Sequence, residues 1–273
     1  MKIEEVQDIK YEKEENGICT LTLNRPERKN AMSMLTFLEI ETVLIEMELD
    51  EKAKVLIITG CKEANAFSSG GYFDLKFLNS IPEHLRHEID PFDLAQKRLC
   101  LKFWDFSKPV IAAINGLAVG AGITLPLTAA DLIYMSDDAW LGFYFVKRSL
   151  HSESFSSFML PFYLGFQKAK EFFYFGDNIT AKEAEKLGLV NKILPPNELM
   201  PYAREQALRL IPPKGPSLSI KLMKRTMHEY FKEILARTLD LENEAIKYIV
   251  KSSDFRESSR ALKEKREPKF KGK

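Results

Sequence analysis

Two short glycine-rich stretches are the parts of this sequence whose residue types and spacing could support chemistry. Residues 67–72 read FSSGGY and residues 116–122 read GLAVGAG, the second directly after the apolar run 108–115. Glycine lets the backbone approach a ligand closely, and the first N–H groups of a helix carry partial positive charge. Such N–H donors suit an oxygen atom that becomes negative during a reaction.

The same glycines do not form a nucleotide-binding fingerprint. Gly120-Ala121-Gly122 begins a G-x-G pattern, but Leu125 occupies the position of the third glycine of a dinucleotide site. The sequence also has no GxxxxGK phosphate loop. A single glycine turn of this kind is more often structural than functional. A functional role for these two turns therefore depends on the other motifs in the sequence.

The elements that must position these turns alternate between strands and helices. Apolar or β-branched runs predict strands at residues 18–24, 54–60, 108–115, 132–136 and 190–194. Helical spacing predicts helices at residues 34–47, around Leu75, and at 94–106, 168–175 and 181–187. Ser33 and Thr180 are suitable N-caps, and Gly188 is a suitable end. Beyond residue 195 the pattern is helical to the last residues, so we expect an α/β core followed by helices.

The composition excludes several classes of protein. The 273 residues contain 40 Lys and Arg and 39 Asp and Glu, a balance that argues against a dedicated nucleic-acid-binding protein. No apolar run reaches the ~18–20 residues of a membrane helix. Cys19, Cys61 and Cys100 are too few for a disulfide framework, and with four scattered histidines they form no metal-ligand set. Because the first residues are polar and acidic, unlike a secretory signal, we expect a cytoplasmic protein without metal, membrane or nucleic-acid partner.

Further motifs accompany the glycine turns in order along the chain. They are Asn24-Arg25-Pro26 with Lys29-Asn30-Ala31, Phe67-Ser68-Ser69-Gly70, Ala113-Ile114-Asn115-Gly116 with Gly120-Ala121-Gly122, Thr180-Ala181-Lys182-Glu183-Ala184 with Gly188-Leu189-Val190, and Ser253-Asp254 with Glu264-Lys265-Arg266-Glu267-Pro268. In this order the sequence resembles the crotonase superfamily of enoyl-CoA hydratases and isomerases, and most closely its enoyl-CoA isomerase branch. The resemblance covers essentially the whole chain.

The resemblance implies a fold, a substrate and an assembly. It implies an α/β fold with a crotonase-type ββα spiral core, residues 1–195, and a helical C-terminal trimerisation region, residues 196–273. The implied substrate is an acyl-CoA thioester, with no cofactor beyond that coenzyme A, and the implied assembly is a homotrimer or a dimer of trimers. An oxyanion hole of two backbone N–H groups falls, by position, on Gly71 and Ala121.

The positions of the acidic residues indicate which reaction of the superfamily to expect. Hydratases of this family place one Glu at the position of Thr124 and a second at the position of Phe145. Adding water needs groups that orient the water and move its proton, so hydratase activity is not expected here. Residues 150–157 (LHSESFSS) resemble the family segment Leu-x-Pro-Glu-Gly-Gly-Ser-Ser, and Glu153 occupies the Glu that carries a proton in one isomerase branch.

The resemblance also indicates residues that contact the substrate. Arg28 and Lys29 lie where the family meets the nucleotide, and Ser69, Phe145 and Phe155 are expected along the acyl and thioester portion. Phe155 replaces a family glycine, which would narrow or reshape the acyl pocket. The Asp that often follows the oxyanion residue is replaced by Tyr72, with Asp74 nearby.

Several functions stay open at this point. The first hypothesis is a Δ3,Δ2-enoyl-CoA isomerase with Glu153 as base. The alternatives are a hydratase, lyase or thioester hydrolase that acts on an unusual acyl group, or a non-catalytic acyl-CoA-binding protein.

Overall fold

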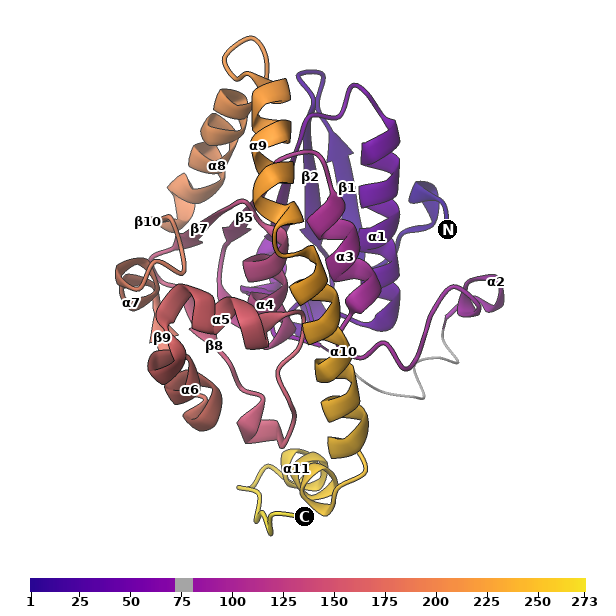
Figure 1. Ribbon diagram of the computed structural model, residues 1–273, viewed down its shortest axis with the longest axis vertical. Helices are drawn as coiled ribbons and strands as arrows, with labels where there is room; N and C mark the ends of the chain where they lie inside the picture. Colours follow the sequence, from indigo (N-terminus) through magenta and orange to yellow (C-terminus); the bar gives the residue numbers. More distant parts are fainter. Residues whose placement is uncertain (72–80) are drawn as a thin grey trace.

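The computed structural model describes residues 1–71 and 81–273 (Figure 1). Tyr72, Asp74 and the helix expected around Leu75 lie outside the described residues. Within the described ranges, none of the helices combines the length and the apolar character required to span a lipid bilayer.

A six-stranded sheet forms the centre of the molecule. Its strands, in spatial order, are β1 (Ile9–Lys13), β2 (Ile18–Leu23), β3 (Val55–Gly60), β5 (Val110–Ile114), β7 (Leu132–Ser136) and β10 (Lys192–Leu194). β1 pairs antiparallel with β2, and the other neighbours are parallel. The five strands expected from the apolar runs are therefore confirmed, and β1 is additional.

Helices cover both faces of this sheet, which explains why β3 and β5 are apolar throughout. Successive strand residues point to opposite faces. In β3, Val55 and Ile57 pack with α8 (Pro196–Leu210), whereas Leu56 and Ile58 belong to the larger core on the other face. That core is completed by α1 (Met34–Leu49), α3 (Lys97–Asp105) and α4 (Ala121–Ala129).

A second, four-stranded sheet connects the two glycine turns. It consists of β4 (Ala66–Ser68), β6 (Leu117–Val119), β8 (Trp140–Gly142) and β9 (Asn178–Thr180). β4 and β6 pair in parallel, so the turn that follows β4 and the turn that follows β6 lie at the same edge. The α4 helix begins at this edge, directly after β6.

The remaining helices lie around these sheets. They are α2 (Glu83–Arg86), α5 (Ser156–Leu164), α6 (Phe166–Phe175), α7 (Ala181–Lys186), α9 (Ser217–Glu229), α10 (Lys232–Ile249) and α11 (Ser253–Lys263). The side chains of Ser33 and Thr180 cap α1 and α7 as expected. Only helices follow β10 in the chain, and Figure 1 shows α10 crossing in front of α3 and α4 toward α11 and the C-terminus.

Candidate active site

The two glycine turns lie in contact with each other. Gly70 has a φ of 101°, and a Cβ atom placed on it would lie 2.7 Å from the Val119 carbonyl oxygen and 3.7 Å from the Ala121 nitrogen. A Cβ atom on Gly122 would lie 2.4 Å from the Ser68 carbonyl oxygen. Only glycine permits this approach of the two backbones. The structure thus brings together the segments that carry Gly71 and Ala121.

The N–H groups of Gly71 and Ala121 point to no acceptor among the described residues. Ala121 is the first residue of α4, and the first N–H groups of a helix have no partner within it. Gly71 forms a bridge with Met32, but the N–H of Met32 donates to the Gly70 carbonyl at 2.8 Å. Within the described part of the chain, neither the Gly71 nor the Ala121 N–H donates a hydrogen bond. Two such donors can stabilise negative charge on a carbonyl oxygen.

Asn30 holds the turn that carries Gly71 in place. Its Oδ1 accepts the Arg25 N–H at 2.9 Å, and its Nδ2 donates to the Ala66 carbonyl at 3.0 Å. The Ser68 hydroxyl donates to the Asn30 carbonyl at 2.8 Å and accepts the Gly70 N–H at 3.2 Å. Asn30 is buried, so these bonds are shielded from water. Through its side chain and its carbonyl group, Asn30 therefore links the end of β2, the strand β4 and the glycine turn.

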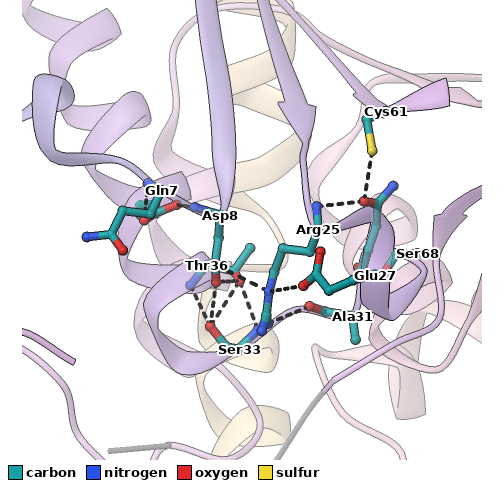
Figure 2. Close-up of polar contacts among 11 residues, drawn as sticks. Gln7, Asp8, Arg25, Glu27, Ala31, Ser33, Thr36, Cys61 and Ser68 are labelled. Atoms are coloured by element: carbon teal, nitrogen blue, oxygen red, sulfur yellow. Dashed lines mark hydrogen bonds and ion pairs between the residues drawn. The ribbon is translucent and has the colours of Figure 1, made fainter. Parts of the chain in front are cut away.

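Arg25, whose N–H is bound by Asn30, also belongs to a buried polar network (Figure 2). Arg25 lies 3.3 Å from the Asp8 carboxylate, which also accepts the hydroxyls of Ser33 at 2.7 Å and Thr36 at 2.5 Å. Glu39 accepts the N–H groups of Gln7 and Asp8 at 2.7 and 2.9 Å. Burial raises the pKa of Glu39 to about 7. This network fixes the start of α1 against the end of β2.

The predicted basic residues lie beside the same turn. Ser69 donates its N–H to the Lys29 carbonyl at 2.9 Å and its hydroxyl to the Arg28 carbonyl at 3.1 Å. The side chains of Arg28 and Lys29 are exposed. The structure therefore places Arg28, Lys29 and Ser69 together at the rim of the Gly71 turn.

The two positions where hydratases of the family carry Glu hold non-acidic side chains near the start of α4. Thr124 is fully buried, and its hydroxyl donates to the Gly120 carbonyl at 3.2 Å. The Phe145 ring is also buried, and a Cβ atom on Gly120 would lie 3.9 Å from its Cε1 atom. Neither residue can act as a general acid or base.

Glu153 is a buried carboxylic acid. Its side chain is 4% exposed, and none of the described residues donates a hydrogen bond to its carboxylate. Burial, together with the neighbouring charge of Glu242, raises its pKa to about 8. A carboxyl group in this state can accept and release a proton near neutral pH.

The turn that carries Glu153 is tied to α4 and to the segment before α3. The Thr128 hydroxyl of α4 donates to the Ser154 carbonyl at 2.5 Å, and the Ser154 N–H donates to the Ala95 carbonyl at 3.2 Å. Ser154 and Phe155 have φ values of 58° and 65°, in the left-handed region. These are the two positions where the family segment has glycines, so the backbone shape persists although the glycines do not.

Phe155 lies inside the core. Its side chain is fully buried, with its ring centroid 4.9 Å from that of Phe158 and 5.7 Å from that of Trp104. The Phe155 ring is thus held by other aromatic rings in the described structure.

His151 lies next to the turn that carries Glu153, and its Nδ1 atom is 2.8 Å from the Ser152 carbonyl oxygen.

One residue of this site, Glu242 of α10, did not emerge from the sequence. It is 1% exposed, and its carboxylate accepts the N–H groups of Phe155 at 2.8 Å and Ser157 at 3.0 Å. Burial raises its pKa to about 7. A signal was present, because Glu242 continues the spacing of the buried residues Leu235, Leu239 and Ile246. A carboxylate in an apolar stripe indicates a buried partner.

Fold and site together define a class of protein. Two glycine turns in contact at the start of α4, and a buried carboxyl group in the turn before α5, stand on an α/β framework. Comparison with known proteins gives the family. The profile described as Enoyl-CoA hydratase/isomerase matches residues 13–273, so the chain belongs to this family, the crotonase superfamily.

Individual relatives carry both hydratase and isomerase names. The chain is 32% identical to crotonyl-CoA hydratase of Syntrophomonas wolfei over 264 residues, 97% of this chain and 98% of the relative. It is 30% identical to enoyl-CoA delta isomerase 2 of Rattus norvegicus over 217 residues, 79% of this chain and 54% of the relative.

A solved structure confirms the predicted fold. The enoyl-CoA hydratase/isomerase from Pseudoalteromonas atlantica T6c matches with a TM-score of 0.82 at 26% identity. The match covers 97% of this chain and 100% of that structure. The expected crotonase-type α/β fold is therefore correct.

Proposed function

We propose that this protein is a Δ3,Δ2-enoyl-CoA isomerase in which Glu153 is the base. The observation that carries the proposal is Glu153 itself, a buried carboxyl group with a raised pKa, at a site whose hydratase positions hold Thr124 and Phe145. The chemistry needs no cofactor beyond the coenzyme A of the substrate. The three cysteines are free, which fits a reducing compartment, and we assign the reaction to the cytoplasm.

The mechanism follows from these groups. The thioester oxygen of a 3-enoyl-CoA accepts hydrogen bonds from the N–H groups of Gly71 and Ala121. Glu153 removes a proton from C2, and the electron pair forms a dienolate whose negative oxygen these N–H groups stabilise. Glu153 then returns the proton to C4, which leaves the double bond between C2 and C3. Each oxyanion donor contributes about 3–4 kcal/mol to such a transition state.

Phosphate groups of the coenzyme A are assigned to the basic rim. Arg28 and Lys29 have exposed side chains and are bonded through their carbonyl groups to Ser69, beside the oxyanion turn. Cationic side chains at this place suit the phosphates of the nucleotide. We assign Phe145, against Gly120, to the wall beside the thioester, and Phe155 to the acyl side, behind the Glu153 turn.

The test is turnover of a panel of acyl-CoA substrates followed by mass spectrometry. Isomerisation leaves the mass unchanged, hydration adds one water and hydrolysis releases free coenzyme A. We expect conversion of 3-enoyl-CoA to 2-enoyl-CoA, with a loss of about 10²–10⁴-fold in kcat for Glu153→Gln. The exposed Glu171→Gln is the matched control and retains the wild-type rate.

Three outcomes would contradict the proposal. Full activity of Glu153→Gln would remove Glu153 from the reaction. Acyl-CoA binding in a calorimeter without turnover of any substrate would favour the non-catalytic alternative, and a product heavier by one water would favour a hydratase.

The assembly belongs to the same proposal. Large apolar side chains are exposed on α9 and on the α5–α6 pair: Leu218, Leu222, Met223 and Met227, and Phe162, Phe166, Tyr174 and Phe175. Exposed apolar surface of this kind marks contacts between subunits. We propose a homotrimer or a dimer of trimers, and light scattering should give three or six times the 31.4 kDa of the chain.

A further inference from the structure

Glu153 and Glu242 form a pair of buried carboxyl groups that come from distant parts of the chain. Glu242 is in α10, and its two oxygens accept the N–H groups of Phe155 and Ser157, in the turn directly after Glu153. The N–H and the hydroxyl of Ser156 donate hydrogen bonds to the Glu153 backbone carbonyl at 3.1 and 2.6 Å. The Glu242 carboxylate is therefore part of the turn that presents Glu153.

The neighbouring residue of α10 holds the other side of this turn. Asn243 accepts the Ala95 N–H at 2.7 Å and donates to the Asp93 carboxylate at 2.9 Å. The Ala95 carbonyl in turn accepts the Ser154 N–H. Glu242 and Asn243 thus fix the Glu153 turn from both sides, and the C-terminal helices contribute directly to the site.

The described side chains that lie near the pair are a neutral thiol and a carboxylate that is bound elsewhere. From α3, Cys100 faces both glutamates, and burial raises the pKa of its thiol well above the ordinary value, so it stays neutral. From the segment before α3, Asp93 is held by Asn243 and by the N–H groups of Lys97 and Arg98. Lys97 pairs with Asp240 of α10 at 2.6 Å. Among the described residues, no cation pairs with Glu153 or Glu242.

We propose that Glu242 is a positioning residue for the Glu153 base: it fixes the turn that carries Glu153, and its negative charge makes Glu153 hold a proton more strongly. The inference rests on the proposed function, in which Glu153 carries the proton from C2 to C4. Two like charges in one buried place ionise in separate steps, because the charge of the first carboxylate opposes ionisation of the second. The stronger base that results is better matched to the weakly acidic C2 position.

The proton affinity of Glu153 can be measured without any turnover. Protein labelled with carbon-13 at the Glu carboxyl groups is titrated by NMR, and the Glu153 signal is the one lost in Glu153→Gln. In Glu242→Gln, which keeps the shape and loses the charge, the Glu153 midpoint should fall by about half a pH unit or more. The control Glu244→Gln removes an exposed charge two residues away on α10 and should leave the midpoint unchanged.

The outcomes separate this inference from the proposed function. An unchanged Glu153 midpoint in folded Glu242→Gln overturns the role of Glu242. If circular dichroism shows that this variant does not fold, the wild-type curve decides: the titration curve of the Glu153 signal is broader than that of a single site if the pair is coupled, and a curve with the width of a single site overturns the inference. Lack of isomerase activity in the wild type would contradict only the proposed function. Where activity is present, the acid limb of kcat against pH should move down with the NMR midpoint.

Discussion

At the scale of single residues, Phe155 shows a conflict between backbone and side chain. A φ of 65° is costly for a residue with a large side chain, by roughly 1–2 kcal/mol. The ring offsets this cost because it is fully buried against Trp104 and Phe158. The position therefore combines a backbone that favours glycine with a core that favours an aromatic ring.

This conflict predicts that, at position 155, glycine destabilises the protein less than alanine does. Phe155→Ala and Phe155→Gly both lose the ring, at about 3–5 kcal/mol, but only glycine relieves the left-handed backbone. We expect Phe155→Gly to unfold at a higher urea concentration than Phe155→Ala, by about 1 kcal/mol in the free energy of unfolding.

Phe158 provides the matched control for this comparison. It lies inside α5, where glycine is less favourable than alanine by about 1 kcal/mol, so Phe158→Ala should be the more stable of its pair. If alanine were also the more stable residue at position 155, the left-handed backbone would not set the preference there.

At the scale of elements, the turn that carries Gly71 depends on connections that a strand of three residues cannot supply by itself. β4 contains only Ala66–Ser68, and its carbonyl at Ala66 is held by the buried Asn30 side chain. Asn30 has a φ of 53°, a conformation that asparagine adopts more readily than most residues. The Asn30 side chain is thus suited both to its own backbone and to the turn.

Removing this side chain should affect rate and stability together. Asn30→Ala leaves the Arg25 N–H and the Ala66 carbonyl without their partner, at a cost of about 1–3 kcal/mol for each buried group. Displacement of Gly71 should lower kcat by about tenfold or more. Asn30→Asp keeps an oxygen acceptor for the Arg25 N–H but turns a second oxygen toward the Ala66 carbonyl, so it should not restore the stability that Asn30→Ala loses in urea unfolding. A wild-type kcat for Asn30→Ala would show that the turn is positioned by other contacts.

The elements also show what the sequence could predict. β3 and β5 could be predicted because strands buried on both faces appear in the sequence as continuous apolar runs, without alternation of apolar and polar residues. β4, β6 and β9 have three residues each, too few for a periodicity to appear, and β1 is mostly exposed. The helix α5 contains Pro161, which weakens its helical pattern.

The site was predictable to the extent that its residues lie in local motifs. The glycine turns and Glu153 could be located in the sequence, and the structure joins the two turns. The contact of Glu242 with the Glu153 turn depends on the packing of α10 against α5, which no local pattern specifies. Packing of this kind decides tertiary contacts, and a single sequence carries no direct record of it.

At the scale of the whole molecule, buried carboxyl groups link stability to pH. Glu39, Glu153 and Glu242 are each less than 5% exposed, and their pKa values are raised from 4.5 to about 7, 8 and 7. The folded protein therefore binds more protons than the unfolded chain between these values. The stabilising contribution is fully present below about pH 4.5 and is lost as the pH rises through 7 to 8.

This linkage predicts that the free energy of unfolding falls from pH 5 to pH 8, and that Glu39→Gln flattens the fall. Each such carboxyl group contributes a slope of up to about 1.4 kcal/mol per pH unit to the free energy of unfolding. The substitution Glu39→Gln removes one titrating group and keeps one oxygen acceptor for the N–H of Gln7 or of Asp8. Exposed acids with lowered pKa, such as Glu257, complete their change below pH 4.5 and do not alter the slope. Urea unfolding of both proteins at pH 5, 6, 7 and 8 measures the two slopes. Parallel curves would mean that Glu39 is ionised throughout, held by its two backbone N–H donors more strongly than burial opposes its charge.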